Sequence, residues 1–136
     1  MIVTMTELPA ELLLTRQLTA ALDTPTFLVD AGGRLVYYNP VAGTLLGTPW
    51  QETWPALEPA VWSARWAPTT IEDVPIPLEQ LPIIVALERR RPVHRWFRIV
   101  GLDGVRRSIE VTAFPLTGKE GEVCGAVSLF WQQEQS

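Results

Sequence analysis

The sequence predicts an α+β fold in which helices lie on one face of an antiparallel sheet. Segments rich in aromatic and β-branched residues are joined by glycine-containing turns of hairpin length. The helical patterns are grouped between an early pair and a late trio of these segments. The 136 residues, of which 47% are hydrophobic, are enough for one domain with a core of its own.

A helix is predicted near the N-terminus, over residues 7–23. Leucines recur there at helical spacing, at Leu8, Leu12, Leu18 and Leu22. The helix ends before Pro25, because the residue that precedes a proline avoids the α conformation. We treat residues 1–23 as a helical extension, residues 24–133 as the main domain and residues 134–136 as a tail.

Two short strands are predicted next, over residues 27–30 and 34–38, with a glycine-containing turn between them. Asn39 follows the second strand and is itself followed by proline, which is a strong signal for the start of a helix. This helix is expected over residues 41–46 and ends at Gly47.

The following segment, residues 48–76, is rich in proline and is predicted to be irregular. It contains four tryptophans in two pairs, and the members of each pair stand four residues apart and share one face of a short helical turn. A longer helix is predicted over residues 77–90. Its buried side is expected to consist of Leu78, Leu81, Ile84, Val85 and Leu87.

Three longer strands are expected to close the chain, over residues 93–102, 105–115 and 122–132. Asp103-Gly104 between the first two is a strong signal for a two-residue hairpin turn. The third strand follows a loop that glycines bracket on both sides.

The pairing across the Asp103-Gly104 turn decides which side chains face the core. A two-residue turn pairs Arg98 with Ile109 and, further along, pairs Trp96 with Val111. Ile109 and Val111 alternate with polar residues, so their row is predicted to face the core together with Trp96 and Arg98. A bulge at the turn would instead send these side chains outward.

Four stretches of the sequence resemble the PAS domain family. Residues 22–42 (LDTPTFLVDAGGRLVYYNPVA) resemble its opening strands and the start of its first helix, and residues 45–47 resemble the end of that helix. Residues 91–116 resemble its central hairpin, and residues 121–130 resemble its last strand. The resemblance covers roughly residues 20–132 and rests on the order and spacing of these pieces.

This resemblance implies a PAS-like five-stranded sheet in the spatial order 2-1-5-4-3, whose helical face encloses a small cavity. The N-terminal amphipathic helix lies outside the stretch that resembles the family. Most members of the family are sensor and dimerisation modules attached to kinases, cyclases or transcription regulators. This sequence shows no such output domain, so the output domain is expected either on another chain or to be absent.

Enzymatic and metal chemistry are not expected. The chain has one cysteine, Cys124, and one histidine, His94, which excludes an internal disulfide, a multi-cysteine metal site and any mechanism with two histidines. No glycine-rich nucleotide motif or zinc-protease motif is present.

Two cofactor classes follow from the resemblance, flavin and haem. Flavin photosensing members carry a reactive cysteine in a Gly-x-Asn-Cys-Arg-Phe motif on a helix, whereas Cys124 falls on a predicted strand. Haem-binding members use a histidine on the helix before the third strand, whereas His94 falls at the start of that strand. We therefore expect no cofactor.

The charge distribution argues against nucleic acid as a partner. The net charge is −4, and nucleic-acid-binding domains usually carry a basic surplus. Seven of the eleven basic residues nevertheless lie between Arg89 and Arg107. This cluster is either a solvated face or a patch for a partner protein or an anionic ligand.

A cytoplasmic protein without membrane contact is expected. No apolar run approaches the roughly 20 residues of a spanning helix. The N-terminus also lacks the basic and then apolar pattern of a secretory signal.

A ligand pocket is expected between the sheet and residues 44–87, because tryptophans there can line an apolar cavity. A core-facing Arg98 needs a partner, since an unpaired buried charge is costly. This partner is either an acid such as Glu79 or Glu88, or the carboxylate of a bound ligand. The pocket candidates are Trp54, Trp62, Trp66, Ile84, Trp96, Arg98, Ile109 and Val111.

The sequence is compatible with two functions. The first is a sensor that binds a small apolar or anionic ligand and signals through dimerisation or contacts with a separate signalling protein. The second is a ligand-free interaction module. The consecutive leucines at 12–14 place apolar surface on more than one side of the first helix. A homodimer is therefore expected, with Leu8, Leu12 and Leu13 at its interface.

Overall fold

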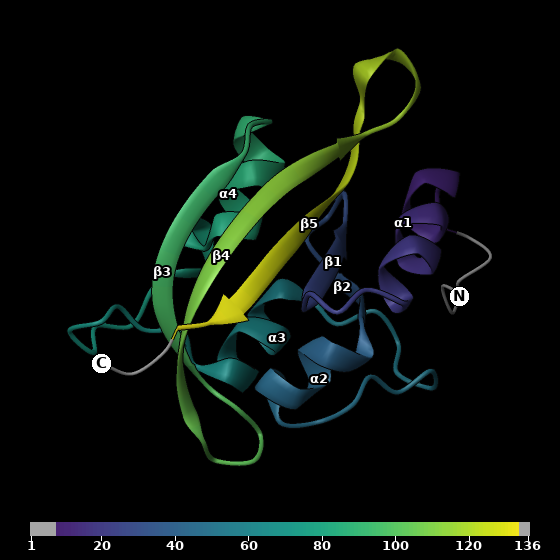
Figure 1. Cartoon of the computed structure of the whole chain (residues 1–136). Helices are drawn as coiled ribbons and strands as arrows, with labels where there is room; N and C mark the ends of the chain where they lie inside the picture. Colours follow the sequence, from purple (N-terminus) through teal and green to yellow (C-terminus); the bar gives the residue numbers. More distant parts are fainter. Residues whose placement is uncertain (1–7, 134–136) are drawn as a thin grey trace.

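The computed structural model describes residues 8–133 and contains a five-stranded antiparallel sheet in the order β2-β1-β5-β4-β3 (Figure 1). This confirms the predicted fold class and strand order. The predicted helix start at residue 7 and the tail at 134–136 lie outside the described residues. The strands are β1 (Thr26–Asp30), β2 (Leu35–Tyr38), β3 (Val93–Val100), β4 (Arg106–Thr117) and β5 (Val123–Gln132).

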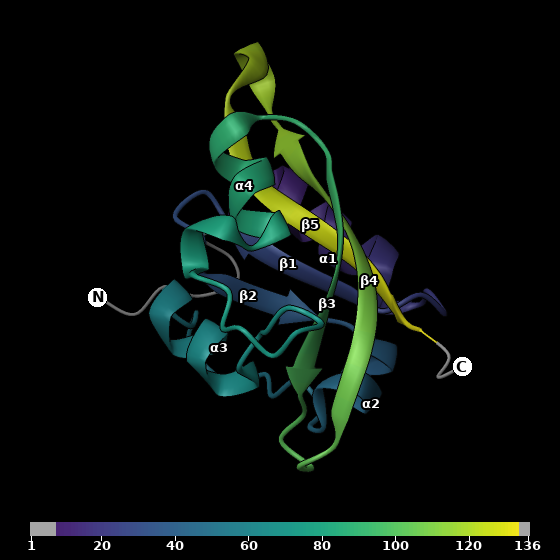
Figure 2. The same cartoon turned by 90° about the vertical axis from the view of Figure 1, so that its left-hand side faces the viewer.

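The helices cover the two faces of the sheet unequally, as Figures 1 and 2 show. Helix α1 (Ala10–Ala20) lies alone against one face, which we call the outer face. The other helices pack on the inner face around the main core, and they are α2 (Pro40–Leu46), α3 (Pro59–Trp66) and α4 (Pro82–Arg89). Among residues 8–133, no helix is both long and apolar enough to cross a bilayer.

Two predicted segments differ in detail from the structure. The stretch 48–76 is not wholly irregular, because α3 forms within it and buries Trp62 and Trp66 on one face. The predicted helix 77–90 is divided into the short 3₁₀ turn η2 (Leu78–Gln80) and α4. Pro82 causes the division, since a proline lacks the N–H that a continuous helix needs and favours the first turn instead.

Only the first half of the predicted leucine stripe, Leu8 and Leu12, packs on the sheet. Leu12 and Thr19 are buried against the outer face, whereas Leu14, Leu18 and Leu22 are exposed. Leu12 is fully buried in a second core cluster and has no surface left for another copy of the chain. Its assignment to a dimer interface is therefore wrong.

Asn39 joins α1, β1 and α2 through its buried side chain. Its Oδ1 accepts from the N–H groups of Thr26 at 3.0 Å and Ala42 at 3.1 Å. Its Nδ2 donates to the carbonyl oxygens of Thr19 and Thr24, both at 2.9 Å. The predicted helix start at Asn39 is confirmed, and the same amide also fixes the end of α1 to the sheet.

The hairpin between β3 and β4 has a different register from the predicted one. Gly101 N–H donates to Val105 O at 2.9 Å, so the turn contains three residues, and Gly104 adopts a φ of +80°. The structure pairs Arg98 with Ser108 and Trp96 with Glu110, one residue away from the prediction.

This slip of one residue exchanges the faces of β3, because side chains alternate along a strand. Phe97 and Ile99 are buried in the main core, whereas Trp96 and Arg98 point to the outer face. On β4 the predicted core row is confirmed, since Ile109 and Val111 are both buried.

The tip of the hairpin docks on the C-terminus of α2. Leu102 N–H donates to Leu46 O at 2.9 Å, and the Arg107 guanidinium donates to Leu45 O at 2.8 Å. Arg107 also pairs with Asp103 at 2.7 Å, and hydrogen bonding from Arg107 lowers the pKa of Asp103 to about 2. The free carbonyls at the negative end of α2 therefore meet a cation and a backbone donor.

Gly47 and Gly104 provide a matched test of this docking. Both have a positive φ, of +82° and +80°, but a Cβ on Gly47 would lie 2.5 Å from Asp103 N, whereas a Cβ on Gly104 would meet nothing within 4 Å. We expect Gly104→Ala to lower the free energy of unfolding by about 1 kcal/mol, from backbone strain alone. Gly47→Ala should lower it by about 2 kcal/mol more, because the hairpin tip must shift.

Urea denaturation of both variants measures this difference. Equal destabilisation by the two substitutions would show that the hairpin tip does not contact α2 in solution.

Candidate functional site

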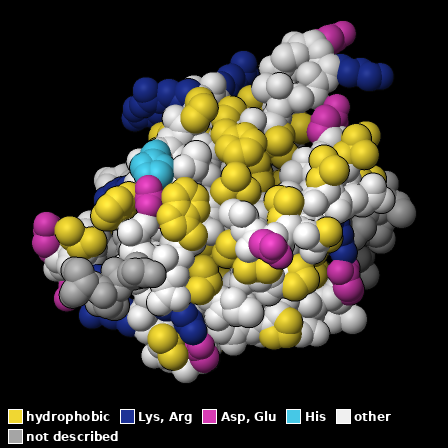
Figure 3. All heavy atoms as spheres, viewed as in Figure 1, with side chains coloured by type: hydrophobic (Ala, Val, Ile, Leu, Met, Phe, Trp, Pro, Cys, Tyr) yellow, Lys and Arg dark blue, Asp and Glu magenta, His cyan; other side chains and the backbone are white. Residues whose placement is uncertain are grey.

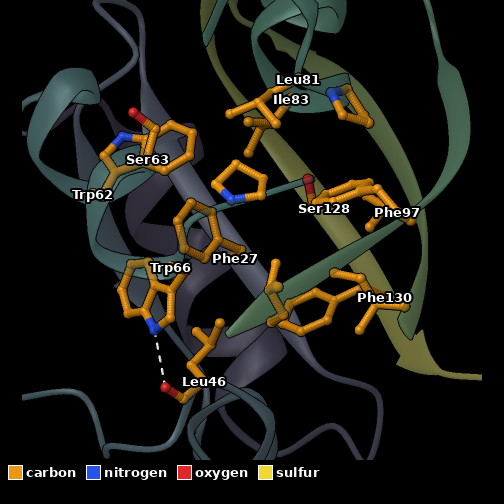
Figure 4. Close-up of a pocket in the computed structure, with 15 residues that line it drawn as sticks. Phe27, Leu46, Trp62, Ser63, Trp66, Leu81, Ile83, Phe97, Ser128 and Phe130 are labelled. Carbon is orange, nitrogen blue, oxygen red and sulfur yellow. Dashed lines mark hydrogen bonds between the residues drawn. The ribbon is translucent and has the colours of Figure 1, made fainter. Parts of the chain in front are cut away.

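A small cavity lies in the main core, between the sheet and helices α3 and α4 (Figure 4). Trp62 and Trp66 from α3 stand on one side of it, and Phe97 and Phe130 from the sheet stand on the other. Its volume is about 70 Å³. The lining residues are Phe27, Leu46, Trp62, Ser63, Trp66, Pro68, Leu81, Pro82, Ile83, Phe97, Ile99, Ile109, Val111, Ser128 and Phe130.

The two tryptophans of α3 are held by their indole N–H groups. Trp62 Nε1 donates to Gly33 O, and Trp66 Nε1 donates to Leu46 O, both at 2.9 Å. Phe27 packs edge-on against both rings, with centroid distances of 5.2 and 6.0 Å. These contacts fix one wall of the cavity to the β1–β2 turn and to the end of α2.

The cavity favours a neutral, apolar occupant. Its lining side chains are hydrocarbon apart from the hydroxyls of Ser63 and Ser128 and the indole N–H groups, which are already bonded. A charged group would lose its hydration there without gaining a counter-charge, which is strongly unfavourable.

The size of the cavity also limits its occupant. Ligand pockets commonly have volumes of about 300–1,000 Å³, and a cavity of about 150 Å³ in another protein holds benzene. A cavity of about 70 Å³ accepts only a few non-hydrogen atoms unless the surrounding side chains or α3 move outward.

The structure brings part of the predicted pocket set together. Trp62, Trp66, Ile109 and Val111 all line the cavity. Trp54 instead packs edge-on against Tyr38 and Trp50, with centroid distances of 6.3 and 5.3 Å. Ile84 is buried beside Gly33 on another side of α4.

Trp96 and Arg98 were predicted for the pocket, and the structure places both on the outer face. The Arg98 guanidinium lies 3.4 Å from the Asp73 carboxylate, and its Nε donates to Ser108 Oγ at 3.3 Å. Glu79 and Glu88 are exposed and do not reach into the cavity. The prediction of Arg98 as an anchor for a carboxylate ligand is therefore wrong, and the one-residue slip of the hairpin is the cause.

The sequence analysis missed the aromatic wall that the sheet contributes. Phe97 and Ile99 share one face of β3, and a three-residue turn would have placed that face toward the core together with Ile109 and Val111. Phe130 lies opposite Val111 on β5 and completes this wall.

The residues that could hold a cofactor lie outside the cavity. Cys124 is on β5 and its thiol donates to Leu116 O at 3.3 Å. His94 is on the outer face, where Nε2 contacts the Glu110 carboxylate and Nδ1 contacts Thr112 Oγ1, each at 2.7 Å. This arrangement does not fit a cysteine-linked flavin or a histidine-ligated haem in the cavity. Among residues 8–133, no three metal-ligating side chains come together.

Comparison with known proteins identifies the fold of the chain but not its activity. No protein-family model matches the sequence, and no curated protein matches it significantly. Solved structures do match, although at low sequence identity, and the chain has the PAS fold.

Three of these structures illustrate the match. The PAS domain of a protein from Colwellia psychrerythraea is 16% identical with a TM-score of 0.61, over 89% of this chain and 97% of that chain. The LOV protein of Rhodobacter sphaeroides is 14% identical with a TM-score of 0.70, over 94% and 70% of the two chains. The PAS domain of the fruit-fly ELK potassium channel is 12% identical with a TM-score of 0.66, over 89% and 95%.

The environment of Cys124 predicts an unreactive thiol. Burial raises the pKa of this thiol, and the nearby Glu11 carboxylate raises it further, so less of the nucleophilic thiolate is present at neutral pH. We expect iodoacetamide to alkylate Cys124 in the folded protein roughly tenfold more slowly than in the urea-unfolded protein at pH 7. A mass-spectrometric time course measures both rates, and a faster reaction in the folded protein would reveal an activated cysteine.

Proposed function

We propose that this chain is a PAS-type sensor module that binds a small, neutral, apolar molecule in the cavity between the sheet and helices α3 and α4. The observation that carries the proposal is the almost wholly hydrocarbon lining of this cavity, which residues of the main core form. The signalling role is proposed by analogy of fold with the PAS and LOV structures that the chain resembles.

The connections of α3 provide a route from the cavity to the surface. An occupant that needs more than about 70 Å³ would push Trp62 and Trp66 outward. Their indole N–H groups are bonded to Gly33 and Leu46, so α3, the β1–β2 turn and the end of α2 would shift together. A ligand shifts such an equilibrium only as far as it binds one arrangement better than the other.

Benzene and benzoate together test this proposal, because they share a ring and differ in charge. We expect benzene at ten times its dissociation constant to raise the melting temperature by about 4 °C. Benzoate at the same concentration should leave it unchanged, because the cavity offers no counter-charge. Differential scanning fluorimetry with both compounds measures the two shifts.

Val111→Phe and Thr112→Phe serve as matched variants for this experiment. Val111 lines the cavity, whereas Thr112 is the next residue on β4 and points to the opposite face. Phe at position 111 should fill the cavity and abolish the benzene shift, and Phe at position 112 should preserve it. The proposal fails if benzene has no effect on the wild type or stabilises both variants equally.

A ligand-free dimerisation module is the second candidate. Leu14 and Leu18 on α1 are 58% and 72% exposed, and Trp96 and Trp131 are exposed on the outer face. Figure 3 shows apolar side chains spread across this face. A second copy of the chain would cover these side chains, and the same surface could contact a separate signalling protein.

Charge substitution on α1 tests this second candidate. We expect the wild type to be a dimer in light scattering and Leu14→Glu/Leu18→Glu to be a monomer, because two buried carboxylates would be unpaired. Gln17→Glu is the control, since Gln17 is also exposed on α1 and is polar already. A monomeric wild type, or a double variant that remains dimeric, would exclude α1 as the interface.

A further inference from the structure

Four arginines gather at the corner where α4 meets β3. Arg89, Arg90 and Arg91 are exposed at and beyond the end of α4, and Arg95 follows on β3. The acid–arginine pairs within residues 8–133 involve other arginines, and Arg95 donates to Gln80 O at 3.3 Å. Figure 3 shows basic side chains gathered above the histidine, at the place where Figure 1 shows this corner.

The acids nearest in the chain do not cancel this charge. Glu88 on α4 and Glu79 on η2 are exposed and form no ion pair with the part of the chain that the structure describes. The corner therefore keeps a net positive charge in a chain whose net charge is −4. Guanidinium groups bind carboxylates through two parallel hydrogen bonds, which makes such a corner suited to carboxylates.

The edge of β3 beside these arginines is open. β3 is an outer strand of the sheet, and alternate residues of a strand bond to alternate sides. Arg98 exchanges both of its backbone hydrogen bonds with Thr69, at 2.8 and 2.9 Å, on the side away from β4. His94 and Trp96 present their N–H and C=O groups on the same side, and no residue in 8–133 bonds to those groups.

We propose that this corner binds an extended acidic segment of a partner protein, which adds a strand to the edge of β3 and places its carboxylates on the arginines. Backbone hydrogen bonds to His94 and Trp96 would supply the pairing, and Arg89, Arg91 and Arg95 would select for acidic side chains. This inference stands apart from the proposed sensor function, because it does not require the cavity to be occupied.

Charge favours this occupant over three others. A second copy paired along β3 would bring two sets of arginines together, which is repulsive. Nucleic acid needs a wider basic surface than four arginines on an acidic chain. A bilayer needs apolar side chains next to the basic ones, and residues 89–92 are three arginines and a proline.

A peptide that alternates glutamate and valine is the probe, titrated against the isotope-labelled wild-type protein and followed by NMR. We expect saturable shifts of the amides of His94 and Trp96 and a dissociation constant that rises steeply with added salt. The same peptide with alternate amides N-methylated keeps its charge but loses its donors, and it should bind at least tenfold more weakly. Equal binding of the two peptides would overturn strand addition.

Two single charge reversals then locate the site. Arg91→Glu and Lys119→Glu change the net charge equally at exposed positions, but Lys119 lies on the β4–β5 loop, which projects beyond the sheet in Figure 1. We expect Arg91→Glu to weaken peptide binding at least fivefold and Lys119→Glu to change it less than twofold. Equal effects would show non-specific attraction. Absence of peptide binding would overturn the proposal, and so would tighter binding of oligouridylate or of phosphatidylserine vesicles than of the peptide.

Discussion

The docking of the β3–β4 hairpin tip on the C-terminus of α2 is the contact on which both faces of the sheet depend. Leu102 N–H and the Arg107 guanidinium take up the free carbonyls of Leu46 and Leu45. The turn reaches them with three residues, and its length sets the register of β3 against β4. This register puts Phe97 in the wall of the cavity and leaves the neighbouring polar and aromatic side chains of β3 outside. One turn residue fewer would put Arg98 into an apolar core without a partner, at a cost of several kcal/mol.

Asn39 fixes the other end of α2 in a comparable way. Its buried amide uses two acceptor and two donor bonds, and these hold the end of α1, the start of β1 and the start of α2 at one point. Since α2 also receives the hairpin tip and the indole of Trp66, it connects the early strands to the late ones. Helix α3 lines the cavity and is bonded to Leu46 at the end of α2 through Trp66. A movement of α3 would therefore be passed to α2.

The parts of the fold that could be predicted from the sequence are those with local causes. Asn39 and Gly47 bracket α2 because capping needs only nearby backbone groups, and the predicted boundaries of α2 agree with the structure within one residue.

The hairpin register could not be predicted in this way, because the bonds from its tip go to carbonyls more than fifty positions earlier in the chain. The prediction of which side of α1 is buried was partly wrong for a similar reason, because the contact with the sheet is not local in the sequence. Leucine spacing predicted a stripe that continues from Leu12 to Leu18 and Leu22, but Thr19 is the residue that meets the sheet in that half of the helix. Half of the predicted pocket residues line the cavity. Trp96 and Arg98 do not, because the register of β3 differs by one residue from the predicted one.

The same register also separates two kinds of chemistry within one strand. The odd-numbered residues Phe97 and Ile99 contribute hydrocarbon to the cavity wall, while the backbone groups of the even-numbered His94 and Trp96 point to the open edge. Charge is thus kept out of the cavity and is concentrated at the corner where β3 begins. A ligand in the cavity would press on Phe97, and Phe97 adjoins Trp96 directly along the backbone. A change in the twist of β3 would then alter the spacing of the edge groups without any charged residue entering the core. The proposed cavity ligand and the proposed acidic segment would therefore differ completely in chemistry and yet bind to different sides of one strand.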